Sequence, residues 1–243
     1  MTPSLWAVVP VKSFSRAKQR LASVLSPTER AGLAQAMLAD VLDALRRSAG
    51  VAGVLVVTAD PHAARVAREA GATVTSAAET GLNDALAHGA RQLAAWPSHG
   101  MLVVPADVPL ITPADVDSIA LAHRASRAVT LVAATDDGGT NALACSPPQA
   151  IPFAFGADSL RRHRQLARAA GLPQCVLTLP RIGRDIDRPD DLPLLLDDPS
   201  PAHTRAWLAA SGVAQRLRAR RPTPRPTPLA ADAYADDALT QKD

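Results

Sequence analysis

The run LWAVVPV (5–11) is apolar along its whole length and rich in valine. A run of this kind, which does not alternate with polar residues, is typical of a strand in a parallel sheet that helices cover on both faces. A basic segment (12–20) follows it. Ser26 as N-cap, Pro27 at the first helical position and Glu29 as capping-box partner then mark a helix. The chain therefore opens with a buried strand, a basic loop and a helix.

The alternation of strand and helix continues to about residue 180. Apolar runs predict the strands, and apolar stripes at helical spacing, with Asp60 and Thr112 as caps, predict the helices. Strands separated by helices indicate crossover connections, and hence a mainly parallel sheet between two layers of helices. The further predicted strands are 51–58, 72–75, 128–135, 175–179 and one within 100–111, and the further predicted helices begin at 60, 81, 112 and 158.

The pattern changes after residue 135. The stretch DDGGTNALAC (136–145) combines turn residues with a short apolar run, so it predicts an antiparallel element or a loop laid over the edge of the sheet. Asp158 is expected to cap the helix that it begins. Two more helices are predicted over 188–196 and 202–221.

The composition indicates a globular protein. The chain has 243 residues, of which 47% are hydrophobic, enough for a core of ordinary size. Only 3% are aromatic and no lysine-rich pattern is present, so nucleic acid is not an expected partner. No run has the length of a membrane span, and we expect a cytoplasmic protein with no membrane partner. Residues 1–221 should form a single domain, and the Pro/Ala-rich residues 222–243 a disordered tail.

The cysteines and histidines give no sign of a metal or catalytic centre. Cys145 and Cys175 stand without CxxC spacing, which predicts two buried thiols rather than a zinc site or a disulfide. The six histidines share no spacing with a carboxylate or a nucleophile that indicates a catalytic unit. We expect most of them at the surface.

Lysine is scarce in this chain, yet two of its lysines lie in the loop after the first strand. The lysines are Lys12, Lys18 and Lys242, against 26 lysines and arginines together. Ligands of an open parallel sheet bind at the carboxyl ends of its strands, where the cations of 12–20 suit a polyphosphate. A solvated basic face is the alternative. The chain has neither GxxxxGK[ST] nor GxGxxG, which argues against a P-loop NTPase and a dinucleotide-dependent dehydrogenase.

Asp107 follows the fourth strand in the stretch VPADVPLI (104–111), between two prolines. It should therefore lie at the same edge of the sheet as Lys12. A carboxylate fixed in this way suits Mg²⁺, which needs only one or two protein carboxylates when phosphates complete its shell. The alternative is a turn residue or a helix cap, although Thr112 is better placed to cap the following helix.

Five stretches follow one another in a recognisable order: VPVKSFSRAKQRL (9–21), PADVPLI (105–111), DGGTNAL (137–143), PFAFGADS (152–159) and DIDRPDDL (185–192). Together they resemble the CofC/FbiD family of guanylyltransferases of coenzyme F420 biosynthesis, from about residue 6 to residue 220. The resemblance implies a three-layer α/β/α fold like that of nucleotide-diphospho-sugar transferases. It also implies the condensation of GTP with 2-phospho-L-lactate, phosphoenolpyruvate or 3-phospho-D-glycerate, giving a guanosine-diphospho acid and pyrophosphate.

The resemblance assigns residues to the nucleotide and the metal. Asp107 and Asp187 would bind Mg²⁺, with Asp185 as a rival for the second position. The alternative role of Asp185 and Asp187 is helix capping ahead of Pro189. Related molybdenum cofactor enzymes have a glycine-rich phosphate loop, whereas this chain has no glycine before residue 32, so its lysines must contribute more. The implied catalytic residues are Lys12, Lys18, Arg20 and Asp107.

Other residues are assigned to the base and the acid. Asn83 would lie near the base or ribose of GTP, although it could also cap a helix. Thr140, Gly156 and Ser159 match the acid-binding residues of the family, and glycine turns and helix starts offer N–H groups to anions. A hairpin turn and a helix cap are the alternative roles here.

The expected partners are small molecules, GTP and the acid, with the next transferase of the pathway as a candidate protein partner. A phosphate monoester is largely ionised at neutral pH, so its attack on the nucleotide needs no general base. Two other functions stay open. One is a different nucleotidyltransferase, such as a molybdenum cofactor guanylyltransferase, and the other is a non-catalytic nucleotide-binding module.

Overall fold

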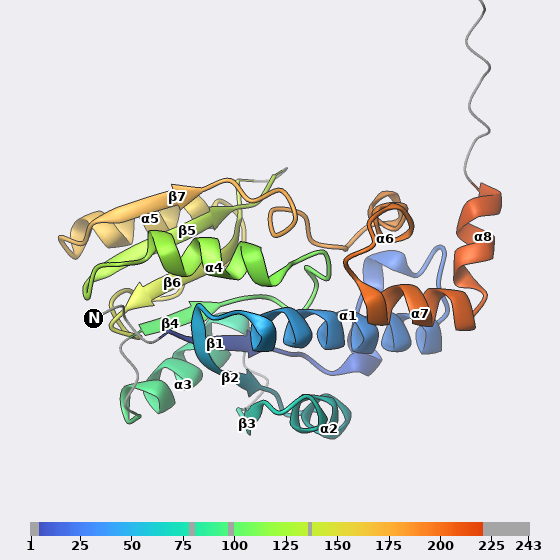
Figure 1. The fold of residues 1–243 in the computed structure, drawn as a ribbon, viewed down its shortest axis with the longest axis horizontal. Helices are drawn as coiled ribbons and strands as arrows, with labels where there is room; N and C mark the ends of the chain where they lie inside the picture. Colours follow the sequence, from blue (N-terminus) through green and yellow to red (C-terminus); the bar gives the residue numbers. More distant parts are fainter. Residues whose placement is uncertain (1–4, 78–80, 97–99, 136–137, 221–243) are drawn as a thin grey trace, which may run out of the picture.

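The computed structural model describes residues 5–77, 81–96, 100–135 and 138–220. Its centre is a seven-stranded sheet in the order β3-β2-β1-β4-β6-β5-β7, in which β6 runs antiparallel to both neighbours. Helices cover both faces, so the predicted three-layer fold with a mainly parallel sheet is confirmed (Figure 1). The strands are β1 (Leu5–Pro10), β2 (Val51–Val57), β3 (Thr73–Thr75), β4 (Gly100–Val103), β5 (Ala128–Ala133), β6 (Thr140–Ser146) and β7 (Gln174–Leu177).

The predicted caps begin three of the helices. Glu29 N donates to Ser26 Oγ at 3.3 Å and Ser26 N donates to Glu29 Oε2 at 2.8 Å, which is the expected capping box. Asp60 caps the helix that begins at Pro61 by accepting from the N–H groups of His62 and Ala63. Thr112 forms a second capping box, with Asp115, at the start of the helix that begins at Pro113. The helices are α1 (Pro27–Arg47), α2 (Pro61–Glu69), α3 (Leu82–Ala94), α4 (Pro113–Ala122), α5 (Ser159–Ala169), α6 (Leu194–Asp197), α7 (Ala202–Ala210) and α8 (Val213–Arg220).

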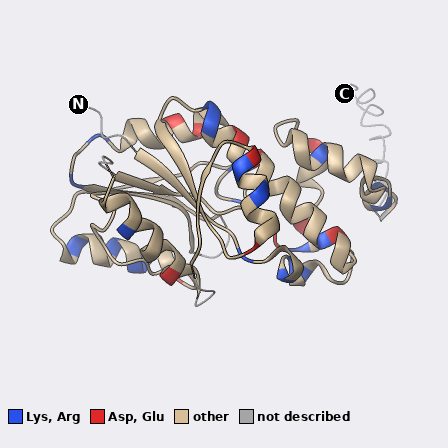
Figure 2. Cartoon of the chain, turned by 90° about the horizontal axis from the view of Figure 1, so that it is seen from below, with Lys and Arg blue, Asp and Glu red and all other residues tan. Residues whose placement is uncertain are grey.

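The sheet buries a core on each face. Val9 of β1 packs in a core with α1, α2 and α4, whereas its neighbour Val8 packs with α3 and α5. None of the seven described strands contains a charged residue, and the strands in Figure 2 are accordingly tan, without blue or red. A strand buried on both faces has no water to solvate a charge. Charged side chains of a site must therefore come from the loops at the strand ends.

The C-terminal helices α6, α7 and α8 lie beyond the carboxyl ends of the strands, beside α1 (Figure 1). The carboxylate of Asp40 in α1 accepts hydrogen bonds from the N–H groups of His203 and Thr204, each at 2.8 Å, and so caps α7 from another helix. Apolar residues of α1, α6, α7 and α8 form a third core. The same core holds Ile186, which fixes the segment that carries Asp185 and Asp187.

Three predicted elements differ in detail. β6 is antiparallel, as one alternative held, but it lies between β4 and β5 rather than over the edge of the sheet, because its residues 142–145 are fully buried. The single helix predicted over 202–221 is two helices, α7 and α8, since Gly212 between them has a φ of +71°. The helix predicted over 188–196 is a 3₁₀ turn (Pro189–Asp191) followed by α6.

Smaller expectations concern a cap, the thiols and the chain end. Asp158 occupies the N-cap position of α5 as predicted, but with a φ of +54° its side chain makes no capping hydrogen bond to the helix. Its carboxylate accepts from Arg161 Nη2 at 3.0 Å instead. Cys145 is buried as expected, but Cys175 is only half-buried. Within the described ranges, no helix has both the length and the apolar character needed to cross a bilayer. The predicted tail (222–243) lies outside the described residues.

Candidate functional site

A cleft of about 770 Å³ opens where β1, β2 and β4 end. Its walls include the basic segment after β1, the loops after β2 and β4, and residues of α1 and of the start of α3. This is the edge at which the ligands of an open parallel sheet bind. The structure brings to this cleft a set of predicted residues, Lys12, Lys18, Arg20, Asp107 and Asp187.

The ammonium group of Lys18 lies between two carboxylates. Its Nζ is 2.8 Å from Asp107 Oδ2 and 2.7 Å from Asp187 Oδ1, and the Lys18 side chain is 7% exposed. Burial acts against the charged ammonium, but the attraction of the two carboxylates outweighs it and holds the pKa of Lys18 above its ordinary value. Lys18 therefore stays charged at neutral pH.

The loop that carries Lys18 is folded by two short 3₁₀ turns, Phe14–Arg16 and Gln19–Leu21. The N–H of Phe14 donates to Asp60 Oδ2 at 2.8 Å, which ties the first turn to the start of α2. Lys18 joins the two turns with a φ of +51°, in the left-handed region. The hydrogen bond to Asp60 thus fixes the basic loop, and the lysines and arginines of this loop line the cleft.

Asp107, Asp185 and Asp187 form an acidic cluster. One carboxylate oxygen of each lies within 4.8 Å of the others. The N–H of Ile186 donates to the carbonyl of Asp107 at 2.9 Å and so joins the two loops. Burial raises the pKa of Asp185, and repulsion from Asp107 and Asp187 adds to it. The sequence left Asp185 and Asp187 as rivals, whereas the structure places both beside Asp107.

The acidic cluster fits a hard divalent cation. Clustered carboxylate oxygens are the donors that Mg²⁺ and Mn²⁺ prefer. Buried Lys18 forms ion pairs with the cluster, and so does Arg20, whose Nη1 is 3.4 Å from Asp187 Oδ2 and whose side chain is 69% exposed. An exposed cation is screened by water and neutralises little charge. The ammonium of Lys18 alone does not balance three carboxylates, so the cluster can accept a further positive charge.

Asn83 uses its side-chain amide to hold a neighbouring loop. Its Oδ1 accepts from Phe155 N at 2.9 Å, and its Nδ2 donates to the carbonyl of Phe155 at 3.3 Å. The N-cap of α3 is Gly81 and not Asn83. Because Gly81 and Leu82 line the cleft, Asn83 links the cleft wall to the loop 152–156. Its contact with a base or ribose stays a prediction.

Thr140, Gly156 and Ser159 come together at the start of α5. The N–H of Thr140 donates to Ser159 Oγ at 2.8 Å, and the N–H of Ser159 donates to the carbonyl of Gly156 at 3.1 Å. Gly156 has a φ of +118°, which favours glycine. In the β4–β6 pair Leu143 lies opposite Val103, so Thr140 extends past the carboxyl end of β4, toward the edge that holds the cleft. The binding of an acid by these residues stays a prediction.

Two buried histidines correct the expectation that most histidines lie at the surface. His163 is 0% exposed and His123 is 1% exposed. Of the other histidines in the described ranges, two are exposed and one is half-buried, and His99 lies outside those ranges. The burial of His163 could have been predicted, because it stands one helical turn after Ser159 and one before Ala167, both of which are buried.

The buried histidines should make stability depend on pH. Burial lowers the pKa of His123 and of His163 from 6.5 to about 4. As pH falls from 6.5 toward 4, the unfolded chain therefore binds protons that the folded chain does not, and the free energy of unfolding falls, by up to roughly 3 kcal/mol per histidine. Urea denaturation at pH 7.5 and pH 5 of the wild type and of a His123→Phe, His163→Phe double variant measures this. The loss should be smaller in the double variant, and an equal loss would contradict the assignment.

Comparison with known proteins finds a family model and several relatives that match most of this chain. A family model described as guanylyl transferase CofC like matches residues 5–220. The phosphoenolpyruvate guanylyltransferase of Conexibacter woesei is 40% identical over 212 residues, covering 84% of this chain and 95% of the relative. The 3-phospho-D-glycerate guanylyltransferase of Colwellia psychrerythraea is 34% identical, covering 77% and 89%. The 2-phospho-L-lactate guanylyltransferase of Methanothermobacter thermautotrophicus is 36% identical, covering 83% and 88%.

Solved structures share the fold. A structure assigned to a nucleotide-diphospho-sugar transferase of Desulfovibrio desulfuricans G20 superposes with a TM-score of 0.64 at 17% identity, covering 89% of this chain and 99% of that one. A nucleotidyl transferase of Methanothermobacter thermautotrophicus superposes with a TM-score of 0.58 at 20% identity, covering 80% and 96%. At these identities the likeness concerns the fold alone.

Proposed function

Because the chain belongs to the CofC-like guanylyl transferase family, we propose that it transfers a guanylyl group from GTP to the phosphate of a three-carbon acid. The products are a guanosine-diphospho acid and pyrophosphate. The candidate acids are those in the names of its relatives: phosphoenolpyruvate, 3-phospho-D-glycerate and 2-phospho-L-lactate. The reaction belongs to coenzyme F420 biosynthesis in the cytoplasm, and the transferase that follows in the pathway is a candidate partner.

The proposal rests above all on the cluster of Lys18 with three carboxylates at the edge of the cleft. Guanylyl transfer brings a phosphate dianion against the α-phosphate of GTP, so the main obstacle is repulsion between anions. The nucleophile is already ionised, and no general base is required. What the site must supply is positive charge and an in-line geometry, and the basic segment 12–20 supports both.

Asp107 and Asp187, with Asp185, are the residues that would hold Mg²⁺. When bound, Mg²⁺ supplies positive charge that neutralises the phosphates. Lys18 holds Asp107 and Asp187 in place and brings a fixed charge to the same point. Lys12 has an exposed side chain that lines the cleft, and with Arg20 and Lys18 it would bind the triphosphate.

The acid would bind beside this cluster, at the start of α5. Thr140 and Ser159 offer hydroxyl groups and the turn at Gly156 offers backbone N–H groups, which together suit a carboxylate or a phosphate. Asn83 joins this loop to the wall of the cleft, where the base or ribose would lie. Nucleotide and acid would thus meet where β4 and β6 adjoin.

Release of pyrophosphate tests the proposal. Purified protein, Mg²⁺ and GTP are incubated with each of the three acids in parallel, and CTP replaces GTP in a second set. We place phosphoenolpyruvate first because five relatives at 40–44% identity carry its name. The expected result is release with GTP and at least one acid, and little or none with CTP.

Other outcomes separate the alternatives. Equal or greater release with CTP would contradict guanylyl specificity and indicate another nucleotidyltransferase. No release with any acid, from folded protein that binds GTP, would contradict the proposed reaction and favour a non-catalytic nucleotide-binding module.

A further inference from the structure

His163 connects the two parts of the proposed acid site from inside the fold. It lies on α5 and is 0% exposed. Its Nδ1 is 3.0 Å from Thr140 Oγ1, and its Nε2 accepts a hydrogen bond from the N–H of Ala154 at 3.0 Å. Ala154 precedes Phe155 and Gly156 in the loop before α5. One imidazole therefore contacts the start of β6 and the loop that carries Gly156.

These two contacts determine the position of the proton on the ring. A backbone N–H can only donate, so Nε2 must be the nitrogen that lacks a proton. Because burial lowers the pKa of His163 to about 4, the ring is neutral at pH 7 and its single proton is on Nδ1. Nδ1 then donates to Thr140 Oγ1. The Thr140 hydroxyl is the acceptor in this hydrogen bond, so the bond does not involve the hydroxyl hydrogen of Thr140.

The hydroxyl of Ser159 is arranged in the same way. Its oxygen accepts a hydrogen bond from the N–H of Thr140 at 2.8 Å, which leaves the hydroxyl hydrogen outside that bond. Thr140 and Ser159 are 6% and 2% exposed, so their hydroxyl groups meet little water. Among the residues that the structure describes, both hydroxyl groups accept from the protein and neither donates its hydrogen to a protein acceptor. An anion is the acceptor that such a pair of donors suits best.

We propose that His163 is a positioning residue for the acid substrate, fixing Thr140 as a hydrogen-bond donor to the bound anion. This inference rests on the proposed function. The bond to Ala154 N adds to the effect, because it holds the loop 152–156 at a fixed distance from Thr140. The Asn83 amide holds the next residue of the same loop from α3. Without the imidazole, Thr140 could turn its hydrogen toward the protein and the loop would lose one of its anchors.

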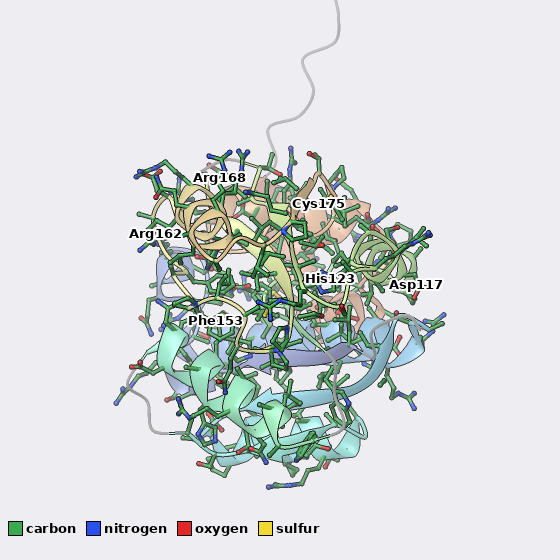
Figure 3. The ribbon with its side chains drawn as sticks, turned by 90° about the vertical axis from the view of Figure 1, so that its left-hand side faces the viewer. Asp117, His123, Phe153, Arg162, Arg168 and Cys175 are labelled. Atoms are coloured by element: carbon green, nitrogen blue, oxygen red, sulfur yellow. The ribbon has the colours of Figure 1, made fainter. Side chains whose placement is uncertain are left out.

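A buried histidine could instead serve packing alone, and His123 provides the matched control. It is also buried, with Nδ1 at 3.0 Å from Thr130 Oγ1 and Nε2 at 2.8 Å from Ser146 Oγ. It lies at the end of α4, on the opposite side of the sheet from α5, as Figure 3 shows. The two histidines thus share burial, hydroxyl partners and a lowered pKa, and differ in their distance from the acid site.

Phenylalanine is a suitable replacement. The ring of His163 packs edge-on against Phe155, with centroids 4.8 Å apart, and a phenyl ring keeps this packing while removing both hydrogen bonds. The His163→Phe variant should raise the KM for the acid about tenfold or more, and leave the KM for GTP unchanged. The His123→Phe variant should be less stable than the wild type, but it should not change the ratio of the KM for the acid to the KM for GTP.

The outcomes separate this inference from the proposed function. If the wild type turns over and His163→Phe keeps its KM for the acid, or raises both KM values equally, the inference is wrong and the proposed function stands. If the wild type releases no pyrophosphate with any acid, both fall together. The second measurement is ¹⁵N NMR of the histidine rings in the wild type: an Nδ1–H tautomer of His163 supports the inference, and an Nε2–H tautomer overturns it whatever the kinetics.

Discussion

The Asp107→Asn variant should fold like the wild type, and its kcat/KM should be about 10³-fold lower. This loss corresponds to the several kcal/mol by which divalent cations stabilise such transition states. Asp107 is the residue that holds the site together: its Oδ2 accepts from Lys18, and it lies within the cluster formed with Asp185 and Asp187. Asparagine keeps the size of the side chain and the backbone bond to Ile186, but removes the negative charge. Steady-state kinetics at saturating Mg²⁺ measures the loss.

Asp190 supplies the control for this experiment. It lies in the same acidic segment as Asp185 and Asp187, and its side chain is exposed. Asp190→Asn removes the same charge from the chain and should keep the wild-type rate. If Asp107→Asn also kept the wild-type rate, the cluster would not be the catalytic centre.

The Lys18→Ala variant should be altered in both turnover and stability. Loss of a charge-assisted contact to a phosphate lowers kcat/KM about 10²-fold. Loss of the buried ammonium also leaves three carboxylates to repel one another, which in the absence of metal lowers the free energy of unfolding by about 1–2 kcal/mol, since the carboxylates are partly exposed. Mg²⁺ should restore more stability to the variant than it adds to the wild type, because it relieves that repulsion. Urea denaturation with and without Mg²⁺ tests this.

Lys12 separates the two effects of Lys18. Its side chain is exposed at the cleft, so Lys12→Ala should weaken GTP binding with an unchanged unfolding midpoint. If Lys18→Ala matched Lys12→Ala in stability, with and without Mg²⁺, then Lys18 would not be the counterion of the cluster.

The backbone of Lys18 bears on the absence of a glycine-rich loop. The chain has no glycine before Gly32. The loop after β1 therefore contains no residue that adopts a positive φ without strain. Lys18 nevertheless has a φ of +51°. A lysine in this conformation is sustained by what its side chain contacts, here Asp107 and Asp187. The side chain supplies charge where a glycine loop would supply N–H groups.

Local signals were sufficient to predict much of the fold. The capping box of Ser26 and Glu29 and the caps at Asp60 and Thr112 involve residues close in sequence, and the structure confirms all three. Loops of a parallel sheet meet at its carboxyl edge, and this rule was enough to predict that Lys12 and Asp107 lie in one cleft.

Features that depend on distant partners were harder to predict. The place of β6 between β4 and β5 is decided by pairing with strands far away in sequence. Helical spacing could indicate that His163 is buried, but not that Thr140 and Ala154 are its hydrogen-bond partners. The contact of Lys18 with Asp187 spans most of the chain, so the sequence could suggest a phosphate ligand but not a counterion of the acidic cluster.

The most direct test of the central claim follows the phosphorus atoms of GTP. The protein is incubated with Mg²⁺ and the accepted acid in two reactions, one with GTP labelled at the α-phosphate and one with GTP labelled at the γ-phosphate. Guanylyl transfer predicts that the α-label appears in a conjugate of GMP with the phospho-acid and the γ-label in pyrophosphate. The γ-label on the acid or in inorganic phosphate would indicate phosphoryl transfer or hydrolysis, and would contradict the account.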